Sequence, residues 1–261
     1  MSENGKQVII KSDNASLAEY VATRFVNRVV KRVAEGKRMH VCLTGGTMGG
    51  AVLRAAAQDP RVGDIDWSQV HFWFGDERFV ERSSPDRNDT QAREALLDHL
   101  DIPAANIHTV ASTDDGIDLD AAAIAYADEL AQFAPGDRSE TGPWPSFDIC
   151  FLGVGPDAHI ASLFPDRPEI SVTDRATVPV RESPKPPSER VSLTRPVINS
   201  SKRVWMVIAG ADKAAALGLA LAGASYQSVP AAGAKGRRRT AFFVDEAAAD
   251  QVPPQLIDRE Y

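Results

Sequence analysis

Apolar residues recur every four positions in the first long segment of the chain, a spacing typical of one face of an α-helix. The residues on this face are Leu17, Val21, Phe25, Val29 and Val33. The polar cluster at residues 12–14 (Ser-Asp-Asn) can cap a helix N-terminus, and Gly36 is a typical residue just past a helix end. The pattern predicts one long amphipathic helix between these two signals.

Short, continuous apolar runs alternate with helical segments along the rest of the chain. The runs predict strands at residues 8–10, 39–44, 70–74, 147–152, 204–209 and 240–244. The intervening segments predict helices at residues 51–58, 88–100, 118–133 and 212–222. Fully apolar strands that alternate with helices favour a mostly parallel sheet covered on both faces. We therefore expect an α/β protein, a Rossmann-like three-layer αβα sandwich, with its ligand beyond the carboxyl ends of the strands.

Length and composition agree with a globular domain. The chain has 261 residues, of which 43% are hydrophobic and 25% charged, and this length allows one large domain or two small ones. Residues 134–145 and the proline-rich residues 183–187 resemble surface linkers, but neither is long enough to mark a domain boundary. We expect a single domain over residues 1–261.

Charge and cysteine content narrow the class of protein. The 29 Lys and Arg against 36 Asp and Glu leave a net charge of −7, which argues against a broadly basic, nucleic-acid-binding surface. Cys42 and Cys150 have neither metal-ligand spacing nor the density of a disulfide scaffold. The polar start lacks a signal-peptide pattern, and no apolar run approaches a membrane span. We expect a soluble cytoplasmic protein with no nucleic-acid or membrane partner.

A glycine-rich turn at residues 44–50 (TGGTMGG) joins a predicted strand to a predicted helix. Glycines let backbone N–H groups approach an anion closely, and a helix N-terminus carries a favourable partial charge. The turn is no Walker P-loop, because no Gly-Lys-Ser/Thr follows. It indicates either a phosphate or carboxylate cradle or a tight turn without a ligand.

The next strand leads into a predicted polar loop at residues 75–85, and this loop begins with charged residues at 75–78 (GDER). This position is where a parallel sheet places its ligands, although a solvated loop with a weak Asp–Arg pair would look the same. We favour a functional interpretation for Asp76 and Arg78. Asn88 either caps the following helix or faces the same cleft.

A third motif, residues 153–159 (GVGPDAH), also follows a buried strand. It matches the dinucleotide fingerprint formally, but Pro165 and Pro168 exclude the long helix that the fingerprint needs. Histidine is the usual general base near neutral pH. A lone histidine is more often structural, but the position of Asp157 and His159 at the functional edge of the sheet favours a catalytic pair.

Basic residues form a fourth group, Lys185, Arg190 and Lys213. A lysine in the first turn of a helix opposes the helix dipole, so Lys213 fits best beside a bound anion, although a solvated lysine is the commoner case. The other four histidines are scattered, and no His, Cys or carboxylate cluster resembles a zinc or iron site. We expect no metal.

Taken together and in this order, the motifs resemble the 6-phosphogluconolactonase family. The resemblance covers residues 41–249. Its specific blocks are GDERFV at 75–80 with Asn88 downstream, LGVGPDAHIASLFP at 152–165, PKPPSERVSLT at 184–194 and GADKA at 210–214. Two departures stand out: Met48 and Gly49 at the end of the glycine turn, and Ala158 and Ile160 where the family has Gly and Thr. Because alanine has no easy access to positive φ, we expect the turn at Ala158 to differ slightly.

The resemblance implies hydrolysis of 6-phospho-D-glucono-1,5-lactone to 6-phosphogluconate, in the oxidative pentose phosphate pathway, without a cofactor. His159 would move a proton from water to the ring oxygen. Asp157 would orient the imidazole, and Arg78 would stabilise the oxyanion or bind the sugar end. The residues that would hold the 6-phosphate are Gly45, Gly46, Thr47, Arg190 and Lys213. Asp76 and Asn88 would contact sugar hydroxyls.

Two other functions stay open. A glucosamine-6-phosphate deaminase or isomerase shares many of these motifs, but it usually has Asp-Glu-Tyr at positions 76–78 and an extra carboxylate where this chain has residues 163–165 (LFP). Ammonia release from glucosamine 6-phosphate would identify it. A non-catalytic sugar-phosphate-sensing module would need a DNA-binding segment, for which we find no room; tight binding without turnover would identify it. The oligomeric state is not readable, and a monomer is our default expectation.

Overall fold

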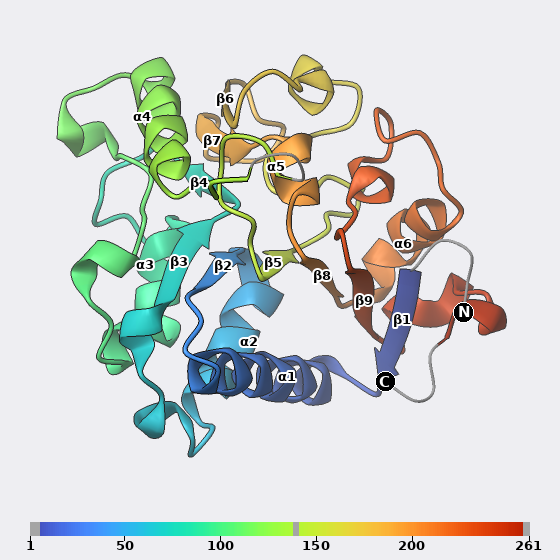
Figure 1. The fold of residues 1–261 in the computed structure, drawn as a ribbon. Coiled ribbons are helices and arrows are strands. Elements are labelled where there is room, and N and C mark those ends of the chain that lie inside the picture. The colour runs from blue at the N-terminus through green and yellow to red at the C-terminus, as the bar shows by residue number, and fades with distance from the viewer. Residues whose placement is uncertain (1–5, 138–140, 258–261) are drawn as a thin grey trace.

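Six parallel strands form the central sheet of the computed structural model, which describes residues 6–137 and 141–257 (Figure 1). In order across the sheet they are β1 (Lys6–Lys11), β9 (Arg239–Asp245), β8 (Arg203–Ile208), β5 (Ile149–Leu152), β2 (Met39–Leu43) and β3 (Val70–Phe74). Every neighbouring pair in this sheet is parallel. The six predicted strands are confirmed, each end within two residues. Residues 1–5, on which we based the absence of a signal peptide, lie outside the described residues.

The register of the strands brings their carboxyl ends to one edge. Leu43, the last residue of β2, pairs with Phe74, the last residue of β3, and Cys42 pairs with Cys150 of β5. Both cysteines are buried and free. The loops that leave β2, β3, β5 and β8 therefore begin at the same edge, and these loops carry the predicted motifs.

Three helices cover one face of the sheet: α1 (Asn14–Ala34), α2 (Gly46–Ala57) and α3 (Asn88–Ala95) (Figure 1). The predicted apolar stripe of α1 is buried here, with Leu17, Val21, Phe25 and Val29 fully inaccessible to solvent. Val33 is half-buried. The long helix and its packing face are confirmed.

The opposite face carries α4 (Leu119–Gln132), α5 (Arg195–Asn199) and α6 (Ala214–Leu221). These helices close a second apolar core against the sheet, so the sheet lies between two helical layers (Figure 1). The three-layer α/β fold is confirmed.

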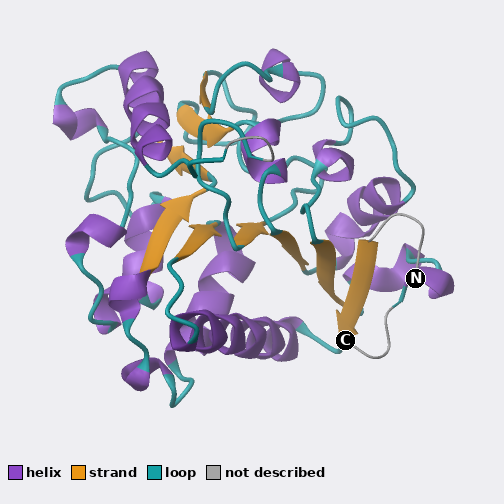
Figure 2. Cartoon of the chain, viewed as in Figure 1, coloured by secondary structure: helices purple, strands orange, loops and turns teal. Residues whose placement is uncertain are grey.

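A second, antiparallel sheet lies on the α4 side of the molecule and was not predicted (Figure 2). Its strands are β4 (Asp76–Arg78), β7 (Arg190–Leu193) and β6 (Thr177–Val180), in that spatial order. We predicted a polar loop at residues 75–85, and this is wrong for β4. The strand is three charged residues long, and its partner lies more than a hundred residues later, so neither periodicity nor a hairpin signal marks it.

Three helix boundaries also differ from the prediction. The helix predicted at 51–58 begins at Gly46, so α2 starts inside the glycine turn. The helix predicted at 88–100 ends at Ala95, because Leu96 leaves helical geometry and a 3-10 turn follows at Leu97–His99. The helix predicted at 212–222 begins at Ala214, after a separate 3-10 turn at Ala211–Lys213.

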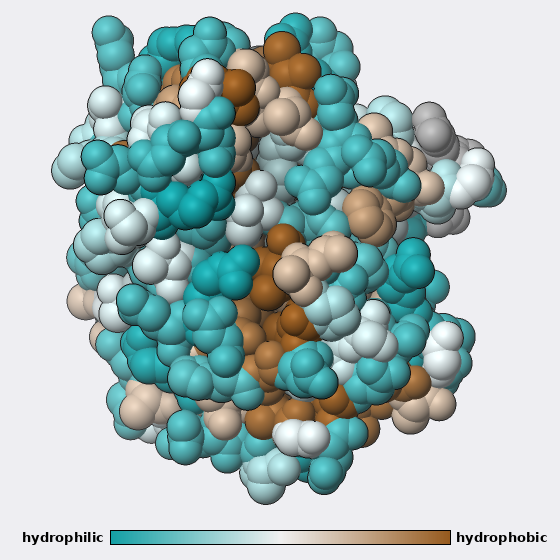
Figure 3. Space-filling view, turned by 90° about the vertical axis from the view of Figure 1, so that its left-hand side faces the viewer, coloured by the Kyte–Doolittle hydropathy of each residue, from teal (hydrophilic) through white to brown (hydrophobic). Residues whose placement is uncertain are grey.

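The side of the molecule that carries α4 is hydrophilic over most of its surface, with a strip of apolar residues at its centre (Figure 3). Only a few large apolar side chains are exposed among the described residues, and Ile124 on α4 is the most exposed of these, at 62%. Within residues 6–137 and 141–257, no helix combines the length and apolar character that crossing a membrane requires.

Candidate active site

A cavity of about 650 Å³ opens at the carboxyl edge of the central sheet. Its walls come from the loops after β2, β3, β5 and β8, together with β4, β7 and the loop before β7. Nine of the ten predicted site residues line it: Gly45, Gly46, Thr47, Asp76, Arg78, Asn88, His159, Arg190 and Lys213. The tenth, Asp157, reaches the cavity through His159. The structure thus brings all four predicted motifs to one place.

The N-terminus of α2 forms one wall of the cavity. Gly45 occupies the N-cap position, no side chain caps this helix end, and Gly46, Thr47 and Met48 also line the cavity. The first backbone N–H groups of a helix have no partners within the helix, and they carry the positive end of its dipole. This wall can therefore accept an anionic group.

Asn88 locks this wall to the loop after β3. Its Nδ2 donates to the backbone oxygen of Asp76 at 2.7 Å and to Asp76 Oδ1 at 3.3 Å. Both partners are acceptors, so the amide Oδ1 must face the other way, toward Gly45. A Cβ at position 45 would lie 1.8 Å from this Oδ1, so only glycine fits there. Of the two roles considered for Asn88, facing the cleft is confirmed, and the N-cap of α3 is Arg87 instead.

Asp76 is buried and sits in a polar network at the floor of the cavity. Ser162 Oγ donates to Asp76 Oδ2 at 2.6 Å, and Arg190 Nη1 lies 3.9 Å from the same oxygen. Ser162 is itself fully buried. The network leaves each carboxylate oxygen of Asp76 with capacity to accept one more hydrogen bond from a ligand.

Arg78 and Arg190 are register partners on the neighbouring strands β4 and β7. Like charges directly opposite each other on a sheet repel, so this pair favours a bound anion. Most N–H groups of the Arg190 guanidinium already donate to oxygens within the protein. Its Nε donates to Pro187 O at 3.1 Å and its Nη2 to Lys185 O at 2.8 Å. Burial lowers the pKa of Arg190, with the neighbouring Arg78 charge adding to the effect. Arg190 therefore holds the preceding loop in place as well as lining the cavity.

The charged residues that line the cavity leave an excess of positive charge. Four of them are cationic and two anionic: Arg78, Lys185, Arg190 and Lys213 against Asp76 and Asp212. Lys213 Nζ donates to Ala209 O at 3.0 Å and lies 3.4 Å from Asp212. A basic cavity in a chain of net charge −7 is suited to an anionic ligand.

His159 and Asp157 form a hydrogen-bonded pair at the rim. His159 Nδ1 lies 2.5 Å from Asp157 Oδ1. Burial raises the pKa of Asp157, but the hydrogen bond with His159 and the charges of His159 and Lys185 lower it by a larger amount. The resulting pKa is about 2. The carboxylate is therefore ionised at neutral pH and can only accept, so Nδ1 carries a proton and Nε2 is the ring nitrogen that points away from Asp157.

Two features of the turn shape this pair. A Cβ on Gly155 would lie 2.2 Å from His159 Nδ1 and Cε1, so glycine provides the space that the imidazole fills. Ala158 has φ +67° despite its methyl group. Ala158 thus adopts the left-handed conformation on whose difficulty for alanine our expectation of a changed turn was based. Its N–H donates to Gly155 O, and its own oxygen accepts from Ala231 N.

Other cavity residues received no role from the sequence. Lys185 was noted as basic but not assigned, Met48 was left unassigned, and Asn14 was taken only as part of a capping cluster. Asn14 could have been found, because β1 is parallel to the other strands and its carboxyl end lies at the same edge. Within the described ranges, no group of three or more His, Cys, Asp or Glu side chains is placed to hold a metal ion.

A parallel α/β sheet with a basic cavity, an anion cradle and a His–Asp pair at its carboxyl edge defines a protein that handles a small anionic ligand. The family model of glucosamine-6-phosphate isomerases and 6-phosphogluconolactonase matches residues 12–243, and the chain belongs to this family. The 6-phosphogluconolactonase of Streptomyces coelicolor is 44% identical over 96% of both chains. That of Mycobacterium tuberculosis is 43% identical over 92% of this chain and 96% of its own.

A solved structure agrees with the sequence relatives. The crystal structure of 6-phosphogluconolactonase from Thermotoga maritima superposes with a TM-score of 0.78 at 26% identity, covering 92% of this chain and 100% of that one. The similarity therefore extends over nearly the whole chain, and the family match at residues 12–243 spans every residue that lines the cavity.

Proposed function

We propose that this protein is a 6-phosphogluconolactonase that hydrolyses 6-phospho-D-glucono-1,5-lactone to 6-phosphogluconate in the oxidative pentose phosphate pathway. The observation that carries the proposal is one cavity that combines a His–Asp pair with an anion cradle and four cationic side chains. The relatives named 6-phosphogluconolactonase, at 43–44% identity over most of both chains, support the same reaction.

The 6-phosphate lies at the N-terminus of α2 in this proposal. Backbone N–H groups at Gly45, Gly46 and Thr47 donate to its oxygens, and Lys213 adds a charge-assisted bond. Arg190 contributes charge and its remaining Nη1 hydrogen. Binding the dianion also relieves the repulsion between the paired Arg78 and Arg190.

The lactone carbonyl lies near His159. Nε2 of His159 removes a proton from water as the water oxygen bonds to C1, and Arg78 stabilises the oxyanion that forms. As the C1–O5 bond breaks, the imidazolium returns the proton to O5, and the new carboxylic acid ionises in water. Asp157 fixes the tautomer and stabilises the transient imidazolium, as the carboxylate of a catalytic triad does.

Asp76 and Asn88 contact sugar hydroxyls in this pose. The free acceptor capacity of the Asp76 carboxylate suits a hydroxyl donor, because its other bonds to Asn88 and Ser162 hold it in place. No step needs a cofactor.

The structure favours the lactonase over the deaminase. Where the deaminase family supplies an extra carboxylate after the His motif, the Phe164 ring lies against the His159 imidazole, with centroids 4.6 Å apart. The carboxylates among the described lining residues are Asp76 and Asp212, and neither bonds His159. The site therefore offers a single acid/base pair, which suffices for hydrolysis.

We further propose that the protein acts as a cytoplasmic monomer with one domain. The described residues of one chain bring together the His–Asp pair, the anion cradle and the four cationic side chains, which supports a monomer as the working state. A mass measured by light scattering at twice the chain mass would contradict the monomer.

Freshly generated 6-phosphogluconolactone and glucosamine 6-phosphate, offered separately to the purified protein, test the function. We expect rapid loss of the lactone above its spontaneous hydrolysis and no ammonia from the amino sugar. Ammonia release would identify the deaminase, and binding without turnover of either would identify a sensing module.

A further inference from the structure

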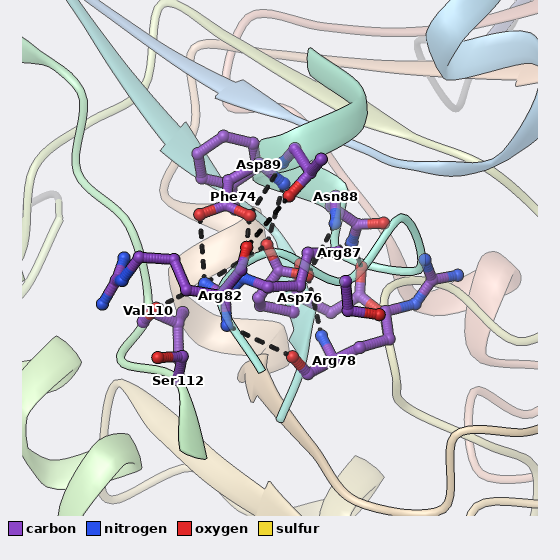
Figure 4. A network of polar contacts seen from close by, with 12 residues as sticks. Phe74, Asp76, Arg78, Arg82, Arg87, Asn88, Asp89, Val110 and Ser112 are labelled. Carbon is purple, nitrogen blue, oxygen red and sulfur yellow. Dashed lines mark hydrogen bonds and ion pairs between the residues drawn. The ribbon is translucent and has the colours of Figure 1, made fainter. Parts of the chain in front are cut away.

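Glu77 is fully buried, although it lies between two residues that line the cavity. Successive side chains of a strand point to opposite sides, so Asp76 and Arg78 face the cavity while Glu77 points into the protein. There it meets the start of α3 and the side chain of Arg87. Figure 4 shows how Arg78, Arg87, Asn88 and Asp89 gather in this polar network. The mechanism proposed above does not use this carboxyl group.

Three backbone N–H groups converge on the Glu77 carboxylate. Oε1 accepts from Arg78 N at 2.8 Å and from Asn88 N at 2.7 Å. Oε2 accepts from Asp89 N at 2.9 Å. A single buried side chain thus fixes the backbone of two cavity residues that lie ten positions apart in the chain.

The Glu77 carboxylate also replaces a missing helix cap. The N-cap residue of α3 is Arg87, whose side chain makes no capping bond. Asn88 and Asp89 are the first residues of α3, and their N–H groups have no partners within the helix. A carboxylate at this position satisfies both groups and interacts favourably with the helix dipole.

Arg87 balances the buried charge. It is fully buried, donates from Nε to Asp89 Oδ1 at 2.8 Å and from Nη2 to Val110 O at 2.7 Å, and lies 3.9 Å from Glu77 Oε2. Burial, with Asp89 adding, raises the pKa of Glu77, while Arg87 and the backbone donors oppose this rise. Both carboxyl oxygens accept from N–H donors, so the contacts suit the ionised form and offset the cost of burying its charge.

We propose that Glu77 is a positioning residue for the lactonase reaction: its carboxylate fixes the backbone at Arg78 and Asn88, and so the side chains that these residues present to the substrate. The inference rests on the proposed function for its kinetic consequence. The positions of Arg78 and Asn88 should also affect the binding of the product, 6-phosphogluconate, so the role of Glu77 can be tested by binding alone.

Glu77→Gln tests the proposal with almost no change of shape. Whichever way the amide turns, its NH₂ group faces at least one backbone N–H, so at least one of the three donors loses its acceptor. We expect kcat/KM to fall, and the Kd for 6-phosphogluconate to rise, by about tenfold or more.

Asp118→Ala is the stability control, since Asp118 caps α4 by accepting from Ala121 N at 2.8 Å, a bond that alanine cannot make, and does not line the cavity. It should lower the melting temperature and leave Kd and kcat/KM unchanged. If Glu77→Gln likewise lowers only the melting temperature, or changes nothing, the positioning role is overturned.

A second variant and a wild-type turnover assay distinguish the remaining outcomes. If Glu77→Gln does not fold, Glu77→Asp keeps the charge but withdraws it by one methylene, and a wild-type Kd in that variant would overturn the proposal. Turnover of the lactone by the wild type tests the proposed function in the same preparation. Should the wild type bind 6-phosphogluconate without turning over the lactone, the lactonase is refuted, while the Kd values still decide the role of Glu77.

Discussion

Replacing Gly155 by alanine should disable catalysis without blocking substrate binding. The added Cβ would lie 2.2 Å from His159 Nδ1 and Cε1 and 2.5 Å from Asp157 Oδ1. Ordinary contact begins near 3.4 Å, so the imidazole must retreat by more than 1 Å. A displacement of this size at a reacting group costs about 100-fold in rate. We therefore expect kcat to fall about 100-fold, with KM close to that of the wild type because the phosphate cradle is untouched.

Stopped-flow or pH-indicator kinetics on freshly prepared lactone, corrected for spontaneous hydrolysis, measure this effect. Gly153→Ala is the matched control, because a Cβ at position 153 would lie 3.8 Å from Thr44 Oγ1, its nearest neighbour. It should retain near wild-type kcat. A Gly155→Ala enzyme that is folded and fully active would refute the role assigned to the placement of His159.

Three other experiments test the anion cradle and the His–Asp pair. Gly45→Ala places a Cβ 1.8 Å from Asn88 Oδ1 and should raise KM about tenfold, which titration with 6-phosphogluconate would confirm as weaker binding. Asp157→Asn removes the acceptor that fixes the His159 tautomer and should lower kcat by 100-fold or more in steady-state assays. Because the pKa of Asp157 is lowered to about 2, its pair with His159 should stabilise the fold above about pH 4, and this contribution should fade as the pH falls toward 2. Acid unfolding of the wild type and Asp157→Asn should therefore differ above pH 4 and converge near pH 2; equal curves throughout would contradict the pair.

The parallel sheet could be predicted because short stretches of sequence indicate its strands and helices without reference to the rest of the chain. Buried strands such as β3 (Val70–Phe74) are continuous apolar runs, and α1 shows its buried stripe at regular spacing. The second sheet could not be predicted in this way. Its strand β4 is short and charged, and its pairing with β7 joins Asp76 to Ser192, a contact that only the complete fold creates.

The site could be assembled from the sequence because parallel strands deliver their following loops to one edge. That rule, with the family resemblance, led to nine residues that line the cavity. It could not reveal Glu77, because a glutamate in a charged segment looks solvated. The burial of Glu77 depends on α3 and Arg87, which pack over it from later in the chain. The positive φ of Ala158 was likewise not foreseen, since the N–H of Ala231, which donates to its oxygen, lies far away in the chain.

Hydrolysis of 6-phosphogluconolactone by the wild type and by His159→Ala tests the central claim most directly. We expect rapid lactone loss with the wild type, and a rate close to spontaneous hydrolysis with the variant at equal folded concentration. Equal acceleration by both proteins would leave a lactonase but contradict His159 as its base. No acceleration by the wild type would contradict the proposed function itself.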